Sequence, residues 1–98
     1  MEERRRGVER ARDAIRRVLQ AGGVVTPQPW EEITSLLNEA LEHDSRGEGN
    51  EALQQIDIAR ERLKSLARMK RPPVWEVAEM EDARRTALQA LDRVPRSI

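Results

Sequence analysis

The sequence predicts an all-α protein, an antiparallel four-helix bundle built from helical hairpins. Four stretches carry apolar residues at steps of three and four, which places those residues on one side of a helix. Segments that contain Gly or Pro separate the stretches, and the period of two that marks a half-buried strand does not occur. Phe and Tyr are absent, so smaller side chains must fill the interior, which suits interlocking helices.

The length of 98 residues predicts one domain, 1–98, whose helices run over residues of about 2–21, 27–42, 50–69 and 74–94. The first helix has an apolar stripe followed by a natural stop. Gly7 should cost about 1 kcal/mol relative to Ala within this helix. The stripe and the stop comprise Val8, Ala11, Ile15, Val18 and then Gly22-Gly23.

The second helix is expected to start with Thr26 as its cap and Pro27 at its first position, where a missing N–H costs little. The segment 43–49 is interpreted as a turn, because it is rich in residues that break helices. So short a connection makes the second and third helices an antiparallel hairpin. The stripe of the second helix is formed by Trp30, Ile33, Leu37 and either Ala40 or Leu41.

Asn50 is predicted to be the N-cap of the third helix, and Pro72-Pro73 to end it. The fourth helix is expected to follow this break directly. The stripe of the third helix comprises Leu53, Ile56, Ala59, Leu63 and Leu66. The stripe of the fourth helix comprises Val77, Met80, Ala83, Ala87, Leu91 and Val94, with Trp75 at its start.

The formal net charge is zero, so the whole chain has no general attraction to nucleic acid or to an anionic membrane. Its charges are nevertheless segregated. Residues 1–17 carry seven Arg and four acidic residues, whereas residues 30–51 carry one Arg and seven acidic residues. Residues 57–71 carry six basic and two acidic residues. This pattern predicts ion pairs between the helices, each worth roughly 0.2–1 kcal/mol where exposed.

No catalytic, cofactor-binding or metal-binding residue is predicted. His43 is the only His, so imidazoles cannot form a metal cluster. The run from His43 to Gly47 loosely resembles a phosphotransfer motif, but that motif lies within a helix and this run is interpreted as an exposed turn. The absence of Cys excludes disulfides. We therefore expect a protein that is not an enzyme and has no cofactor.

The arginines of the first helix are the alternative candidates for a binding site, because they could contact phosphates. Interleaved acidic residues and the lack of Tyr and Phe for stacking argue against nucleic acid. No apolar run reaches membrane-spanning length and no secretory signal is recognisable, so a cytoplasmic location is expected. The arginines in question are Arg4, Arg5, Arg6, Arg10, Arg12, Arg16 and Arg17.

The stretch from Ala11 to Gly22 resembles the second lid helix of DnaK-type heat-shock chaperones. The similarity covers roughly residues 8–66. It continues through Val25-Thr26-Pro27, Glu31-Glu32-Ile33, Leu37, Ala40-Leu41, Gly47-Glu48, Ile56 and Leu63. The chain departs from the family in the longer turn at 43–49 and in the break at Pro72-Pro73, and no residue can be assigned to the latch between lid and peptide-binding subdomain.

This resemblance implies a non-catalytic lid that closes over the peptide-binding subdomain of a chaperone and slows release of the bound client. The implied partner is therefore a protein, either that neighbouring subdomain or a client polypeptide. The alternative is a stand-alone helical module that binds another protein through its apolar stripes, and that module could be a homodimer. Neither interpretation predicts a membrane or a nucleic acid as partner.

Overall fold

The computed structural model describes residues 2–21, 28–66 and 74–94, without the side chains of residue 2 and residues 74–78. Within these ranges lie four helices, and none of these residues forms a strand. The helices are α1 (Glu2–Ala21), α2 (Gln28–Ser45), α3 (Gly49–Leu66) and α4 (Val74–Asp92). The helical bundle predicted from the sequence is thereby confirmed.

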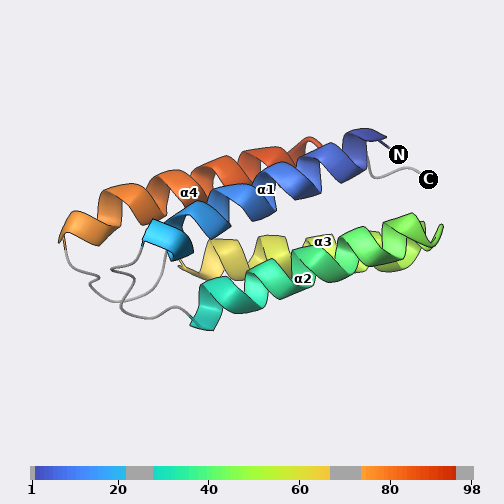
Figure 1. The fold of residues 1–98 in the computed structure, drawn as a ribbon, viewed down its shortest axis with the longest axis horizontal. Coiled ribbons are helices and arrows are strands. Elements are labelled where there is room, and N and C mark those ends of the chain that lie inside the picture. The colour runs from blue at the N-terminus through green and yellow to red at the C-terminus, as the bar shows by residue number, and fades with distance from the viewer. Residues whose placement is uncertain (1, 22–27, 67–73, 95–98) are drawn as a thin grey trace.

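The helices run alternately up and down, so that each is antiparallel to its neighbours (Figure 1). The bundle has α1 and α4 as one antiparallel pair and the α2–α3 hairpin as the other. Helix α1 also packs along α2, whereas fewer residues of α3 and α4 lie close to one another. The molecule is elongated, measuring 41 by 21 by 18 Å, and its two termini lie at the same end.

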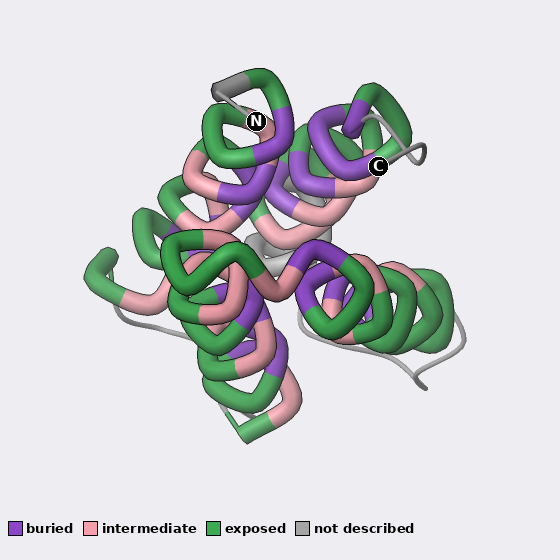
Figure 2. The backbone as a smooth tube through the Cα atoms, turned by 90° about the vertical axis from the view of Figure 1, so that its right-hand side faces the viewer, coloured by how far each residue is buried: buried purple, intermediate pink, exposed green. Residues whose placement is uncertain are grey.

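The buried residues of each helix face the other helices, and the exposed residues face outward (Figure 2). The predicted stripe residues of α1 and α2 are buried, with Ala40 inside and Leu41 at the margin of the core. Such a core of branched aliphatics and Ala needs close helix–helix approach. The central cluster comprises Val8, Ala11, Ile15, Trp30, Ile33, Leu37, Ala40, Ile56, Ala59, Leu63, Ala87, Ala90, Leu91 and Val94.

The α2–α3 connection differs from the predicted turn at 43–49, because His43, Asp44 and Ser45 remain helical. The chain reverses at Gly47, whose φ of 78° is in the left-handed region. The N–H of Glu48 donates to the carbonyl of His43 at 2.8 Å, and that of Gly47 to the carbonyl of Asp44 at 3.1 Å. These two bonds form a Schellman motif. The glycine therefore ends α2, and the polar residues before it do not.

The predicted N-cap at Asn50 is wrong, because α3 already begins at Gly49. The carbonyl of Glu48 accepts the first bond of the helix, from the N–H of Ala52 at 3.0 Å. Within α3, Ala52 is buried, whereas Leu53 and Leu66 are half-buried at the edge of the core. The buried face of α3 is thus shifted slightly from the predicted stripe, toward Ala52 and away from Leu53.

Helix α4 ends at Asp92, two residues before the predicted end, although Val94 is buried as expected. Ala90 also joins the core, which the predicted stripe did not include. Gly7 is a contact point between α1 and α4 rather than only a weak helix former. A Cβ added there would lie 2.7 Å from Val94 Cγ2 and 3.1 Å from the carbonyl oxygen of Ala90.

Several predictions fall outside the described residues. These are the stops at 22–23 and 72–73, the cap and first position at 26–27, the last turn of the third helix at 67–69, and the side chains of Trp75 and Val77. Among the helices of the described ranges, none combines the length and the hydropathy that a membrane span requires.

Candidate functional site

A buried ion pair joins the first turn of α1 to the last turn of α2. Arg4 Nε donates to Asp44 Oδ1 at 2.8 Å. The side chains are only 6% and 12% exposed, respectively. Because a buried charge needs a partner of opposite charge, each of these two residues requires the other. Both lie where their helices would continue the apolar stripe by one more turn, so the pair closes this end of the core.

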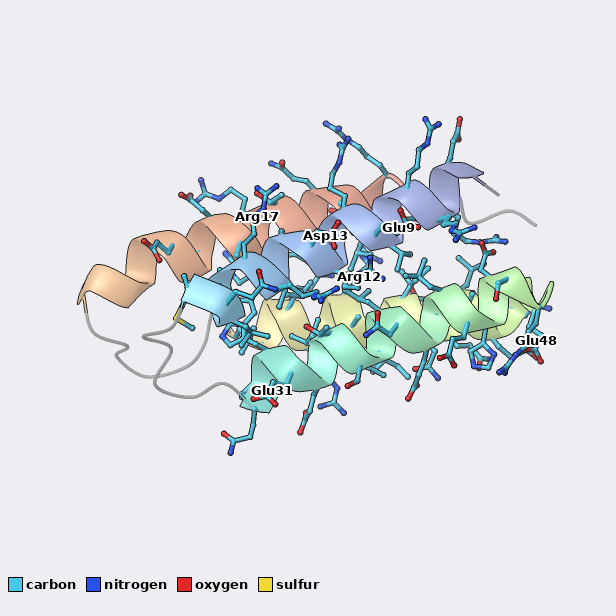
Figure 3. All side chains as sticks on the ribbon, viewed as in Figure 1. Glu9, Arg12, Asp13, Arg17, Glu31 and Glu48 are labelled. Atoms are coloured by element: carbon cyan, nitrogen blue, oxygen red, sulfur yellow. The ribbon has the colours of Figure 1, made fainter. Side chains whose placement is uncertain are left out.

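Further polar contacts join neighbouring helices. Arg12 of α1 donates to the side-chain oxygen of Asn38 on α2 at 3.3 Å, reaching across as Figure 3 shows. Between α2 and α3, Arg62 Nη1 lies 2.6 Å from a carboxylate oxygen of Glu32. Between α3 and α4, Arg60 Nη2 lies 2.6 Å from Asp92 Oδ1. The acidic second helix is thus paired with both basic neighbours, as the segregated charges predict.

The end of the hairpin carries a small polar cluster around Glu48 (Figure 3). Its carboxylate lies 3.1 Å from His43 Nδ1 and 4.0 Å from Arg46 Nη1. Together with the backbone bonds of the Schellman motif, these contacts explain the residues of the apparent phosphotransfer motif as parts of a helix end. Asp44, which stands next to His43 in sequence, is bound by Arg4 from the other helix pair.

The arginines of α1 do not gather into one surface. Arg4 is buried against α2, Arg5 pairs with Glu9 at 3.0 Å, and Arg12 pairs with Asp13 at 3.3 Å. Arg6, Arg10 and Arg17 line a depression between α1 and α4. This arrangement differs from the uniform cationic stripe that a nucleic-acid site needs.

One carboxylate on α4 has a shifted pKa. The hydrogen bond from Arg84 lowers the pKa of Glu81, and the charges of Arg84 and Arg85 lower it further. The same hydrogen bond raises the pKa of Arg84. Because the pKa of Glu81 is lower in the folded chain than in the unfolded chain, its pair with Arg84 stabilises the fold at any pH above the ordinary pKa of Glu. This stabilisation is lost as the pH falls through the lowered pKa of Glu81.

A groove runs along the outer side of α1 and α4. Three adjoining depressions form it, each sharing rim residues with the next. We call it the α1–α4 groove. Its floor consists of small or apolar residues, namely Gly7, Ala14, Val18, Ala21, Ala83 and Ala90. Its rim consists of Glu3, Arg6, Glu9, Arg10, Asp13, Arg17, Glu79, Asp82, Thr86 and Arg93.

A separate depression lies beside α2 and is largely acidic, with Glu31, Glu32 and Glu39 on its walls and Arg62 opposite. Glu31 marks the start of α2 in Figure 3, and Asp13 and Arg17 mark the side of α1 along which the α1–α4 groove runs. Within the described part of the chain, no group of three or more His, Asp and Glu residues could hold a metal ion.

The sequence contained a signal for the Arg4–Asp44 pair that the stripe analysis did not use. Arg4 lies four residues before Val8, and Asp44 lies four residues after Ala40, so each continues an apolar stripe with a charge. Opposite charges at such positions on neighbouring antiparallel helices predict a buried pair. Because residues 43–49 were interpreted as a turn, Asp44 was not counted as a continuation of the stripe of the second helix.

The groove had no comparable signal, since its two walls are far apart in sequence. Only the packing of α1 on α4 brings Arg17 near Glu79 and Asp82. Comparisons of the chain with protein-family models, with curated proteins and with solved structures find no match.

Proposed function

We propose that this chain is a non-catalytic helical module that closes over a neighbouring protein surface, in the manner of the lid of a DnaK-type chaperone. In this proposal the bundle covers a peptide held by an adjacent peptide-binding subdomain, and it slows release of that peptide. The chain works in the cytoplasm and carries out no reaction itself. Nucleotide acts on another domain of the chaperone.

The observation that carries the proposal is that the helices are tied into one body. A lid must move as a unit, and a polar contact or a tight apolar contact joins every pair of neighbouring helices. Arg4–Asp44, Arg62–Glu32 and Arg60–Asp92 join successive helices. The close approach of Gly7 to Ala90 and Val94 joins α1 to α4 and to the residues that directly follow it.

The connection between α2 and α3 gives further support. The sequence departs from the lid family if residues 43–49 form a long turn, but α2 continues through Ser45 and α3 starts at Gly49. The short connection is therefore closer to the family pattern than the sequence alone suggests. The similarity itself still depends on the residues between 8 and 66.

The position of the termini predicts which end of the bundle would meet the neighbouring subdomain. Both termini and the α2–α3 connection lie at one end of the molecule (Figure 1). A subdomain joined ahead of residue 1 would therefore be nearest to this end. Arg46 is exposed there, and its Nη1 lies 4.0 Å from Glu48 Oε1. We assign Arg46 to the contact with the subdomain.

The test is a fusion of this chain to the peptide-binding subdomain of a lidless DnaK-type chaperone. Release of a fluorescent peptide should be slower from the fusion than from the lidless protein. Arg46→Glu should restore much of the fast release. Lys64→Glu, an equal charge change at the far end of α3, should leave release slow. Equal release rates with and without the bundle would contradict the proposal.

The α1–α4 groove favours a second candidate, a stand-alone helical module that binds a protein along one face. A lid that acts through the end of the bundle has no use for this groove, whereas an interaction module would. In this second candidate the groove takes a helical partner, and the pairing of helices supplies most of the buried area. Removing charge from the groove should weaken partner binding without changing peptide release in the fusion.

A further inference from the structure

We propose that the α1–α4 groove is a dimerisation surface that takes a second copy of this chain in antiparallel orientation. The inference rests on the second candidate function, and it names the partner of that module. It is carried by the distribution of charge along the groove, by the shape of the groove floor and by the size of the face.

The two ends of the groove have opposite charge. At the end near the termini, Arg6, Arg10 and Arg93 line the rim with Glu3. At the other end, Glu79 and Asp82 line the rim with Arg17. Arg10, Glu79, Asp82 and Arg93 form no ion pair within the part of the chain that the structure describes. These charges are therefore available to a molecule that lies in the groove.

This polarity selects one orientation of a second copy. A parallel arrangement would place the basic ends against each other and the acidic ends against each other. A two-fold axis across the middle of the groove turns the basic end of one copy onto the acidic end of the other. A partner of uniform charge would meet like charge at one end, whereas in a second copy the basic end meets Glu79 and Asp82 at both places.

The spacing along α4 fits this arrangement. Glu79 and Arg93 are equally far from Thr86 in sequence, about 10 Å on either side along a helix. An axis that passes at Thr86 therefore places Arg93 of one copy opposite Glu79 of the second copy, and the symmetry repeats the contact. Thr86 itself is exposed and would lie near Thr86 of the second copy.

The floor and the size of the face allow such a contact. Gly7, Ala14, Ala21 and Ala90 have short side chains or none, so the helices of a second copy can approach closely. The molecule measures 41 by 21 by 18 Å, and one long face thus offers roughly 800 Å², the area that one partner contributes to an interface of standard size.

The first test is sedimentation of the full chain over a range of concentrations. The wild type should form a dimer that weakens as salt rises. Arg93→Glu should raise the dimer dissociation constant about tenfold, because like charges then meet at two symmetric places. Arg93→Glu/Glu79→Arg should restore dimerisation. The matched control is Arg16→Glu, an equal charge change on the exposed part of α1 outside the groove rim.

A second test determines which faces of the two copies meet in the dimer. The chain has no Cys, so one engineered Cys gives an unambiguous product. Thr86→Cys should form a disulfide-linked dimer readily, and Ser35→Cys on the outer side of α2 should not. A chain that stays monomeric at all concentrations would overturn the proposal, even if the fusion still slows peptide release and the lid function stands. Failure of the charge swap to restore dimerisation, or equal crosslinking at both Cys positions, would also overturn it.

Discussion

Arg4 and Asp44 show how two charged residues can belong to a hydrophobic core. Each occupies a position that an apolar residue would fill in a regular stripe, and each is nearly enclosed. Exposed pairs such as Arg62–Glu32 differ, because water screens both charges and the side chains are about half exposed. Burial therefore decides which of the pairs matters for stability.

Asp44→Ala should lower the free energy of unfolding by about 3 kcal/mol, because it leaves the Arg4 guanidinium buried without its carboxylate. Glu32→Ala, which breaks the exposed pair with Arg62, should cost less than about 1 kcal/mol. Urea unfolding of both variants measures the difference. Similar small losses in the two variants would show that Arg4 reaches water when Asp44 is removed.

Leu63 tests the position of the core on α3. Its side chain is fully buried, whereas Ile58 on the same helix is 43% exposed. Leu63→Ala should cost about 2–5 kcal/mol, through lost burial and the cavity left behind. Ile58→Ala should change stability by no more than about 0.5 kcal/mol. If denaturant melts gave equal losses, the assignment of the buried face would be wrong.

The fully buried residues of this kind were largely predictable, because apolar periodicity identifies a core face directly. Leu63, Ile56 and Ile33 were all expected inside and are fully buried. Asp44 was not, since local turn propensity argued against a helix there. Its burial depends on Arg4, a residue forty positions away, so the pair can be found only by comparing the ends of two different stripes.

At the scale of the helices, glycine decides two features of the structure. Gly47 ends α2 through its positive φ, and the segment before it stays helical despite its polar composition. Gly7 lies within α1, where an added Cβ would meet Val94 and the backbone of Ala90. The sequence correctly marks both residues as unusual for helices. It does not say which glycine ends a helix and which one makes room for a neighbour.

Gly7→Ala tests whether the close approach of α1 to α4 is required. In an exposed helix this change would stabilise by about 1 kcal/mol. Here the new Cβ would lie 2.7 Å from Val94 Cγ2, and crowding of this kind costs about 1–3 kcal/mol. We therefore expect a net loss of about 1 kcal/mol in thermal or urea unfolding.

The control for this variant is Gly7→Ala combined with Val94→Ala. The double variant removes the nearest contact, so the effect of Gly7→Ala should become less unfavourable in that background than in the wild type. A stabilised Gly7→Ala single variant would mean that the two helices are further apart than the structure places them.

For the whole molecule, the net charge is zero, but the charges are distributed unevenly in two ways. The acidic second helix pairs with basic neighbours inside the bundle, which stabilises the up-and-down order of the helices. The charges left over on α1 and α4 divide between the two ends of the α1–α4 groove. The first asymmetry could be predicted from segment charges, and the second required the structure.

The fold class was predictable because four stripes and their breaks agree with one another, whereas a function is not encoded in such a pattern. Bundles with the same architecture serve many purposes, and only surface features distinguish them. Here those features are the charged end beside Arg46 and the α1–α4 groove. Both functional proposals require that the four helices hold these surfaces in fixed positions.

Native-state hydrogen exchange tests this requirement most directly, through the backbone amides of Ile15, Leu37, Ile56 and Leu91, one from each helix. If the helices form one cooperative body, the four amides should open with the same free energy, equal to that of global unfolding. An opening free energy for α1 and α4 well below that for α2 and α3 would contradict the account, because the two pairs would then separate while each remained folded.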